Sequence, residues 1–276
     1  MDSPVLTFQT LASGSSGNLA VVRSRRATIL LDLGIQVQRD LLQRLASAGV
    51  DPAATTAALV SHEHSDHLGA FGLRWCVDHR VPVLAGRSAL VAAAELHRNK
   101  MSREVPAGLL QEVRAGATYL VQDMEVTPFD VPHDVPTFGY VIRTGTGDAR
   151  KTIVVATDLG CARQELLPWF TDADAIVIEA NYDEGMLSRS HRHPRDRARV
   201  ASDRGHLSNT QSGVFLREVI EASRNRPRCI LLAHLSRDHN RPELATETVL
   251  HQLASAGRGV PLHAAPASMA GFRIEP

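Results

Sequence analysis

A cluster of side chains that can bind metal ions lies near residue 60. In the stretch LVSHEHSDHLG, the seven residues from Ser61 to His67 include three histidines, one glutamate and one aspartate. In an extended loop, His62 and His64 project to the same side, while Asp66 and His67 can point at a second ion. Imidazole and carboxylate ligands without thiolate suit Zn²⁺, Mn²⁺ or Fe. The loop is therefore predicted to serve two divalent metal ions.

Two other interpretations of this loop are weaker. A zincin needs the pattern H-E-x-x-H on a helix, and Asp66 stands where the second histidine would have to be. A lone surface histidine is usually solvated, but several candidate ligands within one short loop argue against that interpretation.

Other candidate ligands follow other predicted strands. His133 lies in VPHDVPTFGY, Asp158 in IVVATDLG and His234 in ILLAHLSRDHN. Strand ends that meet at one edge of a layered fold can build a site that no local motif could form alone. This convergence is the strongest functional signal in the sequence.

The elements that must position these residues alternate between strand-like and helix-like patterns. Short β-rich runs predict strands at Val5–Ala12, Leu19–Arg23, Thr28–Leu33, Ala57–Val60, Glu125–Phe129, Phe138–Arg143, Thr152–Ala156, Ala175–Glu179 and Cys229–Ala233. Apolar residues at helical spacing predict helices within Ile35–Gly49 and at Ser88–His97, Gln211–Ala222 and Pro242–Ala256. This mixture predicts a layered α/β sandwich, with one domain over residues 1–276.

Composition limits the classes of partner. The chain of 276 residues is 43% hydrophobic, which supports a substantial core. Its 30 basic and 30 acidic side chains cancel, so a nucleic-acid partner would have to be held by a local patch. Cys76, Cys161 and Cys229 form no CxxC pair, which argues against disulfides and a thiolate zinc site. No apolar run approaches the roughly 18 residues of a membrane span, and the first residues lack a secretion pattern, so we expect no membrane partner and a cytoplasmic location.

The motifs occur in the order of a known family. H-x-H-x-D-H after a strand, then a separate histidine, aspartate and final histidine, resembles the metallo-β-lactamase superfamily. Seven motifs together resemble its YycJ/VicX (WalJ) branch of nuclease-like proteins related to ribonuclease Z: ASGSSGN, ILLDLG, VPHDVPTFGY, ATDLG, VIEANYDEGML, RGHLSN and AHLSRDHN. The resemblance runs from about Leu6 to about Leu244.

The resemblance implies a four-layer αββα fold with a binuclear metal centre at the edge of two sheets. The first metal would be held by His62, His64 and His133, and the second by Asp66, His67 and His234. Asp158 would bridge the two ions. Asp32 would orient the ligand loop without binding a metal ion itself, although a turn-forming role at a strand end explains this residue about as well.

The implied reaction is phosphodiester hydrolysis, because two metal ions can acidify a water and stabilise charge on a phosphoryl group. The candidate catalytic residues are Asp66, His206 and Glu179. His206, in GHLSN, would protonate the departing oxygen or neutralise the phosphate, and Glu179 would orient it and keep it charged. A helix-capping cluster before Asn209 is the alternative for this motif.

A basic segment, SRSHRHPRDRARVASDRGHLSN, leads directly into His206. Its residues Arg195, Arg197 and Arg199 are candidate contacts to a nucleic-acid backbone, with a solvated helix face as the alternative. His239 and Asn240 are candidates for lining the substrate pocket, and an ordinary loop before a helix explains them nearly as well. The turn SGSSGN is interpreted as structural and outside the site.

Three functions compete. A metal-dependent nuclease is favoured, and the resemblance suggests DNA rather than RNA and 5′ to 3′ exonuclease action. A hydrolase of a lactone, thioester or lactam is disfavoured because no secretion signal is present. A non-catalytic binding protein would predict lost ligands, whereas the set is complete. An inserted β-CASP domain does not fit, since the interval from Asp158 to His234 is too short.

Overall fold

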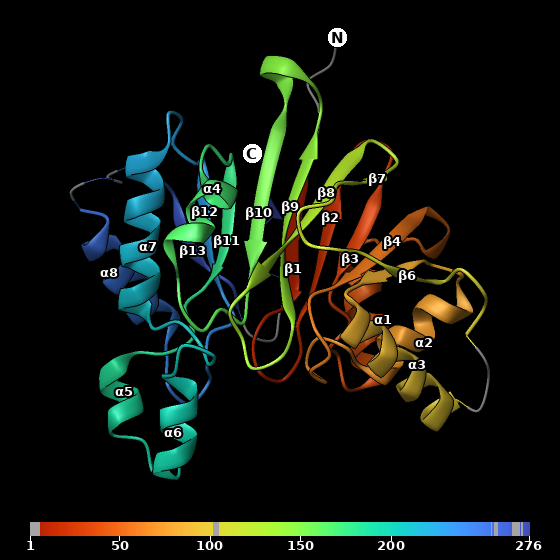
Figure 1. Ribbon diagram of the computed structural model, residues 1–276, viewed down its shortest axis with the longest axis horizontal. Coiled ribbons are helices and arrows are strands. Elements are labelled where there is room, and N and C mark those ends of the chain that lie inside the picture. The colour runs from red at the N-terminus through yellow and green to blue at the C-terminus, as the bar shows by residue number, and fades with distance from the viewer. Residues whose placement is uncertain (1–5, 102–104, 255, 257–258, 267–270, 272) are drawn as a thin grey trace.

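Two facing β-sheets with helices on both outer sides make up the architecture (Figure 1). The computed structural model describes residues 6–101, 105–254, 256, 259–266, 271 and 273–276. Each sheet has seven strands. The arrangement confirms the predicted α/β class and the four-layer αββα sandwich.

The first sheet has the strand order β14-β1-β2-β3-β4-β5-β6. Its antiparallel part joins β14 to β1, β2 and β3, and its parallel part joins β3 to β4, β5 and β6. The strands span β1 Thr7–Ala12, β2 Leu19–Arg23, β3 Thr28–Leu31, β4 Thr55–Val60, β5 Val83–Ala85, β6 Leu110–Glu112 and β14 Arg273–Ile274. On its outer side lie α1 Gln38–Ser47, α2 Ala70–Asp78 and α3 Arg87–Met101.

The second sheet has the order β13-β12-β11-β10-β9-β8-β7. Strands β7 to β10 pair antiparallel, and β10 to β13 pair parallel. The strands span β7 Tyr119–Val121, β8 Met124–Val131, β9 Thr137–Thr144, β10 Lys151–Ala156, β11 Ala175–Glu179, β12 Cys229–Ala233 and β13 Leu262–Ala264. Its outer side is covered by α4 Leu167–Phe170, α7 Asn209–Ala222 and α8 Pro242–Gln252.

Alternating side chains along the strands supply separate cores. In β11, Val177 packs between the sheets, while Ile176 and Ile178 pack outward against the helices. In β3, Ile29 packs between the sheets and Leu30 packs outward. Both faces of these strands are therefore buried, which explains why they read as continuous apolar runs.

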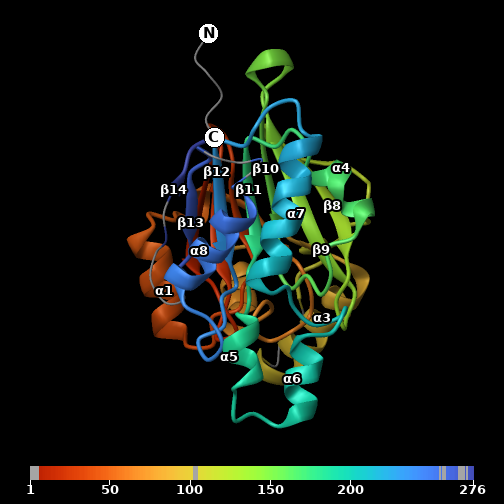
Figure 2. The ribbon, with the colours of Figure 1, turned by 90° about the vertical axis from the view of Figure 1, so that its left-hand side faces the viewer.

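The candidate ligands follow strands that end at one edge of the sandwich. At that edge, α5 Glu184–Ser188 and α6 Pro194–Val200 project beyond the sheets, and Figure 2 shows the same projection from the side. Tyr182, Leu187 and Val200 form a small buried apolar cluster in this projection. We call residues 182–204 the arm. No helix in the described part of the chain is long and apolar enough to span a membrane.

Most predicted elements are present with shifted ends. The strand predicted as Thr28–Leu33 ends at Leu31, because Asp32 has a left-handed φ of 60° that interrupts the extended backbone. The helix predicted to reach Gly49 ends at Ser47, and Gly49 itself has a φ of 62°. The helix predicted as Pro242–Ala256 ends at Gln252. Val5 lies outside the described residues.

Candidate metal centre

The ligand loop after β4 packs tightly against the first sheet. The Leu33 amide donates to the carbonyl of His67 (2.7 Å), and the Asn18 amide donates to that of Asp66 (2.7 Å). A Cβ atom on Gly34 would lie only 1.6 Å from the Asp66 carbonyl oxygen. Glycine is therefore required in ILLDLG by the close approach of two backbones.

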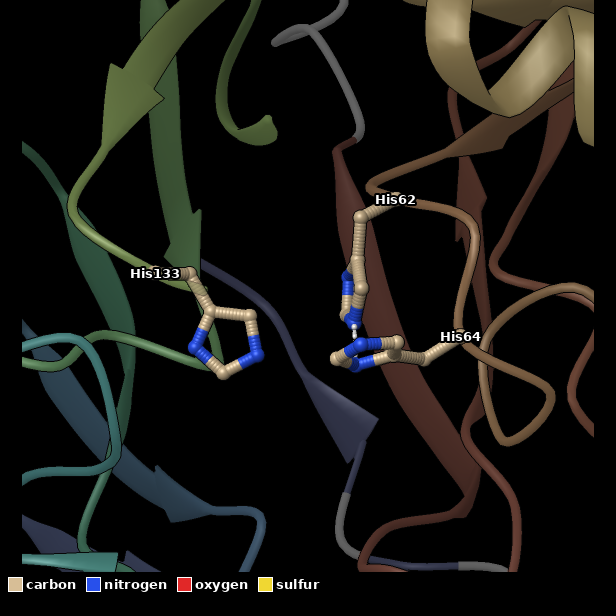
Figure 3. Close-up of side chains that lie close together, drawn as sticks. All are labelled: His62, His64 and His133. Atoms are coloured by element: carbon tan, nitrogen blue, oxygen red, sulfur yellow. Dashed lines mark hydrogen bonds between the residues drawn. The ribbon is translucent and has the colours of Figure 1, made fainter. Parts of the chain in front are cut away.

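The first triad consists of His62, His64 and His133. Figure 3 shows the first two on one loop and His133 on the opposite side, with the rings pointing into a common space. His62 Nε2 lies 3.0 Å from His64 Nδ1. One nitrogen from each ring can be chosen so that all three lie within 4.8 Å of one another. This spacing suits three ligands of one metal ion.

The second triad consists of Asp66, His67 and His234. Asp66 Oδ2 lies 3.7 Å from His67 Nε2 and 3.6 Å from His234 Nε2. The two histidine side chains are 0% and 1% exposed, whereas Asp66 is 22% exposed. Asp66 is thus the member of this triad that is open to solvent.

Asp158 lies between the two triads. Its carboxylate is 2.9 Å from His67 Nε2, 3.6 Å from His234 Nε2 and 4.0 Å from His133 Nε2. It also forms a possible ligand group with His62 and His67, which belong to different triads. Its position is therefore compatible with a shared ligand.

Several buried polar atoms at this centre have the chemistry of ligands for a divalent cation. His133 Nε2, His234 Nε2 and Asp158 Oδ2 are buried and lack a well-aligned hydrogen bond within the described part of the chain, although Asp158 Oδ2 lies 2.9 Å from His67 Nε2 and His133 Nε2 lies 3.1 Å from Asp134 Oδ1. Buried polar groups in native proteins almost always have a partner. Nitrogen and oxygen donors at this spacing fit a divalent metal ion, which would satisfy all three atoms.

Two buried carboxylates contact the Nδ1 atoms of candidate ligand histidines. Asp32 Oδ2 lies 2.7 Å from His67 Nδ1, and Asp32 Oδ1 accepts hydrogen bonds from the amide (2.8 Å) and hydroxyl (2.9 Å) of Ser61. Glu179 Oε1 lies 2.8 Å from His234 Nδ1. A carboxylate on the Nδ1 side fixes the ring and leaves Nε2 free for a metal.

Glu179 also contacts His206, as the sequence predicted. Its Oε1 lies 2.8 Å from His206 Nδ1, and its Oε2 accepts from the amides of Leu159 (2.9 Å) and Leu207 (3.1 Å). Burial disfavours the charged form of His206, but Glu179 raises its pKa above the usual value. The His206 side chain is 14% exposed and lies 3.8 Å from Asp158. Asp158, Glu179, His206 and His234 form a further group that could hold a metal, which overlaps the second triad.

Two histidines of the first triad are held neutral. Burial lowers the pKa of His62 well below its usual value, and the charge of His67 adds to this effect. Burial also lowers the pKa of His133. A metal binds the lone pair of a neutral imidazole. Both rings therefore already have the protonation state of a ligand.

The carboxylates near the second triad favour a positive charge. Burial opposes a charge on His234, yet Asp158 and Asp66 raise its pKa to about 10. Asp158 and Asp32 likewise outweigh burial and raise the pKa of His67 well above its usual value. The same negative surroundings stabilise a divalent cation.

Three residues at the centre have left-handed backbone conformations. The φ angles are 60° at Asp32, 55° at Asp158 and 54° at His234. Each follows a strand, and the left-handed turn ends the extended conformation at the residue whose side chain belongs to the centre.

The predicted substrate residues are dispersed. Arg197 donates to the Ser188 carbonyl, and Arg199 Nη1 lies 3.4 Å from Asp134. Arg195 is exposed and has no side-chain partner among the described residues. His239 is buried and its Nε2 lies 2.8 Å from Ser190 Oγ.

The side chain of Asn240 forms hydrogen bonds within the protein. Its side-chain amide donates to the Ala180 carbonyl (2.8 Å), and its side chain also bonds Asn209. This pairing joins the loop before α8 to the start of α7.

The sequence analysis left one residue of this centre, Asn18, outside the site. Asn18, in the turn interpreted as structural, has its side-chain nitrogen 2.8 Å from His67 Nε2. Its side chain also bonds the Gly14 backbone, which gives the turn its shape. Its pairing with the ligand loop is long-range, so the local pattern held no signal for it.

The chain matches the beta-lactamase superfamily domain over residues 27–214. Exodeoxyribonuclease WalJ of Streptococcus pneumoniae is 31% identical over 261 residues, covering 92% of this chain and 90% of that protein. Exodeoxyribonuclease YycJ of Bacillus anthracis is 31% identical over 259 residues, covering 92% of each chain. A ribonuclease of Thermus thermophilus is 26% identical over 198 residues, with 67% of this chain and 44% of that protein covered.

A solved structure supports the fold assignment. The metallo-beta-lactamase fold protein YhfI from Bacillus subtilis aligns with a TM-score of 0.69 and 15% identity, over 99% of this chain and 100% of that one.

Proposed function

This chain belongs to the WalJ/YycJ branch of the beta-lactamase superfamily, and from that premise we propose that it is a two-metal phosphodiesterase that degrades DNA from the 5′ end. WalJ and YycJ, which align over most of their length, are both called exodeoxyribonucleases. The ribonuclease aligns over less than half of its own length, which favours DNA over RNA as the substrate.

One observation carries the proposal: two triads of candidate ligands lie close together, and Asp158 lies within 4.0 Å of ring nitrogens from both of them. His62, His64 and His133 would hold one ion, Asp66, His67 and His234 the other, and Asp158 both. Two divalent ions, Zn²⁺, Mn²⁺ or Fe, would supply an acidified water and stabilise the charge that builds on a phosphoryl group.

His206 is suited to act on the departing oxygen. Glu179 accepts a hydrogen bond from Nδ1–H and favours the charged ring, which leaves the Nε2 proton for a phosphate oxygen. Its small exposure allows contact with a substrate while most of the ring stays fixed. Asp66, the most exposed member of its triad, would accept a hydrogen bond from an attacking water.

A cleft beside the first triad gives a nucleotide room to bind. Its volume is about 630 Å³, and His133, Asp134, Arg163 and Arg204 are among its lining residues. Two guanidinium groups in this lining can bind phosphate oxygens. The cleft thus brings two guanidinium groups close to a candidate ligand, in a lining that also holds the carboxylates of Asp130, Asp134 and Glu165.

End-labelled single- and double-stranded DNA and RNA, each incubated with Mn²⁺ or Zn²⁺, test the proposal directly. We expect a 5′ label to be released as a short product at the earliest times, while a 3′ label stays on long fragments. Asp158→Ala protein prepared in parallel controls for a contaminating nuclease. Cleavage of RNA alone, or of a lactone or thioester without any nucleic-acid cleavage, would refute the proposal.

A further inference from the structure

A second cleft, of about 640 Å³, lies in the arm and faces the loop before α8. It shares none of its lining residues with the cleft beside the first triad. Its walls carry the guanidinium groups of Arg189, Arg192 and Arg241, together with Ser190, Asp238 and His239. Asp238 is the one carboxylate among the lining residues of this cleft.

The two walls of this cleft are fixed to each other. The Asp183 amide donates to the His239 carbonyl (2.8 Å), and Ser190 Oγ lies 2.8 Å from His239 Nε2. The first wall follows Glu179 in sequence and the second follows His234. Glu179 and His234 are themselves in contact, so the cleft is anchored to the metal centre through both of its walls.

The cleft has an excess of positive charge. Asp238 forms an ion pair with Arg192. Among the described residues, neither Arg189 nor Arg241 forms an ion pair with a carboxylate. Two guanidinium groups thus remain without a countercharge. Burial lowers the pKa of His239, and the charge of Arg192 lowers it further, as expected where the potential is positive.

An anion with several oxygens is the ligand that matches this lining. Guanidinium groups bind phosphate through paired, charge-assisted hydrogen bonds, and a serine hydroxyl can add another donor. We propose that the arm cleft binds a phosphate group of the DNA strand while the metal centre acts on another. This inference rests on the proposed function, and either the terminal 5′ phosphate or an internal one would supply the same chemistry.

This site uses arginines other than those predicted from the sequence. Arg197 and Arg199 already have partners within the protein, at Ser188 and Asp134. Arg189, Arg192 and Arg241 are exposed, so replacing them removes no core packing. Their replacement therefore tests binding with little risk to folding.

The test measures binding without cleavage, using phosphorothioate-linked single-stranded DNA with either a 5′ phosphate or a 5′ hydroxyl. The variant is Arg189→Ala/Arg241→Ala. The charge-matched control is Arg39→Ala/Arg98→Ala, which removes two exposed arginines from α1 and α3 on the other side of the sandwich. We expect the cleft variant to bind about tenfold more weakly, the size of one charge-assisted contact. The slope of log K against log salt should decrease by about 0.7 for each lost phosphate contact.

The two oligonucleotides distinguish whether the cleft binds the terminal 5′ phosphate or an internal one. Loss of a preference for the 5′-phosphorylated strand assigns the terminal phosphate, and equal weakening of both strands assigns an internal one. Binding and salt slope equal to those of the control variant would overturn the proposal. If wild-type protein cleaves no nucleic acid but the variant still loses binding, the proposed function fails and the cleft assignment survives.

Discussion

Glu179 Oε1 lies 2.8 Å from Nδ1 of His234, and the same oxygen lies 2.8 Å from Nδ1 of His206. One buried carboxylate thus supports both a candidate metal ligand and a candidate acid. The family resemblance pairs Glu179 with His206 only. On that basis, replacing Glu179 would slow catalysis without affecting metal binding. The contact with His234 changes that expectation.

Glu179→Gln should weaken metal binding as well as cleavage. A neutral amide removes the negative charge behind both rings, and loss of such support typically costs 10- to 100-fold in metal affinity. We expect about one ion per chain after dialysis against a competing chelator, with slower DNA cleavage. Metal analysis and rate measurements on the same preparation check this. Full retention of both ions at wild-type affinity would show that His234 does not need Glu179.

His206→Ala should keep both metal ions and cleave DNA about 10²- to 10⁴-fold more slowly, the usual contribution of a positioned acid. A nitrophenyl ester, whose leaving group needs no proton, should show a smaller deficit. Comparison of the two substrates at saturating metal measures this difference. Loss of an ion would instead make His206 a ligand in the overlapping group with Asp158, Glu179 and His234.

The purified protein should bind two divalent transition-metal ions per chain. Asp158→Ala should reduce that content more than His133→Ala, because Asp158 lies near members of both triads and His133 belongs to one. Metal analysis by mass spectrometry after reconstitution gives the stoichiometry. A wild-type content of one ion, or none, would exclude the binuclear arrangement.

Replacing Arg195 and replacing Arg197 should have different effects. If Arg195, Arg197 and Arg199 all contacted the nucleic-acid backbone, replacing them together would weaken DNA binding and reduce its dependence on salt. The structure suggests that Arg195→Ala alone lowers the salt slope, since Arg195 is free to meet a phosphate. Arg197→Ala should instead destabilise the arm, because its guanidinium donates to Ser188. Salt titrations of binding and hydrogen exchange of residues 184–200 distinguish these effects. Equal salt slopes for Arg195→Ala and wild type would support the alternative interpretation, in which Arg195 lies on a solvated helix face.

Gly34→Ala should disturb the second triad without changing any ligand. The new Cβ would overlap the Asp66 carbonyl at 1.6 Å, so the backbone of the ligand loop must move. We expect lower thermal stability and a loss of metal content. Gly49→Ala is a useful comparison, because a Cβ there meets nothing within 4 Å and only its φ of 62° is strained. Normal metal content in Gly34→Ala would show that the loop can relax at no cost to the site.

The sequence could predict the candidate ligands because each stands in a short motif directly after a strand. His62, His133, Asp158 and His234 needed only the correct strand assignment and the expectation that those strands end at one edge. The short strands β5, β6, β7, β13 and β14 were missed, because two or three residues cannot show a repeating pattern. Their positions depend on pairing with neighbours.

Contacts between distant segments could not be predicted. Asn18 reaches His67 across 49 positions, and Arg199 reaches Asp134 across 65. The charge of the arginine segment was correctly recognised, but which guanidinium groups stay free depends on how α5 and α6 pack. Motifs in the sequence therefore identified the candidate ligands that the fold brings together, but not which arginines remain unpaired on the surface.

The left-handed residues at the strand ends also bear on how this protein can evolve. Side chains with a β-carbon disfavour that conformation by roughly 1–2 kcal/mol, although aspartate tolerates it better than histidine. Asp32, Asp158 and His234 all adopt it, and a whole domain is typically stable by only about 5–15 kcal/mol. Selection for stability alone would favour glycine at these positions, and glycine would remove two candidate ligands and the carboxylate that contacts His67. If these residues hold metal ions as proposed, a more heat-resistant variant would have to gain its stability in the sheets and helices.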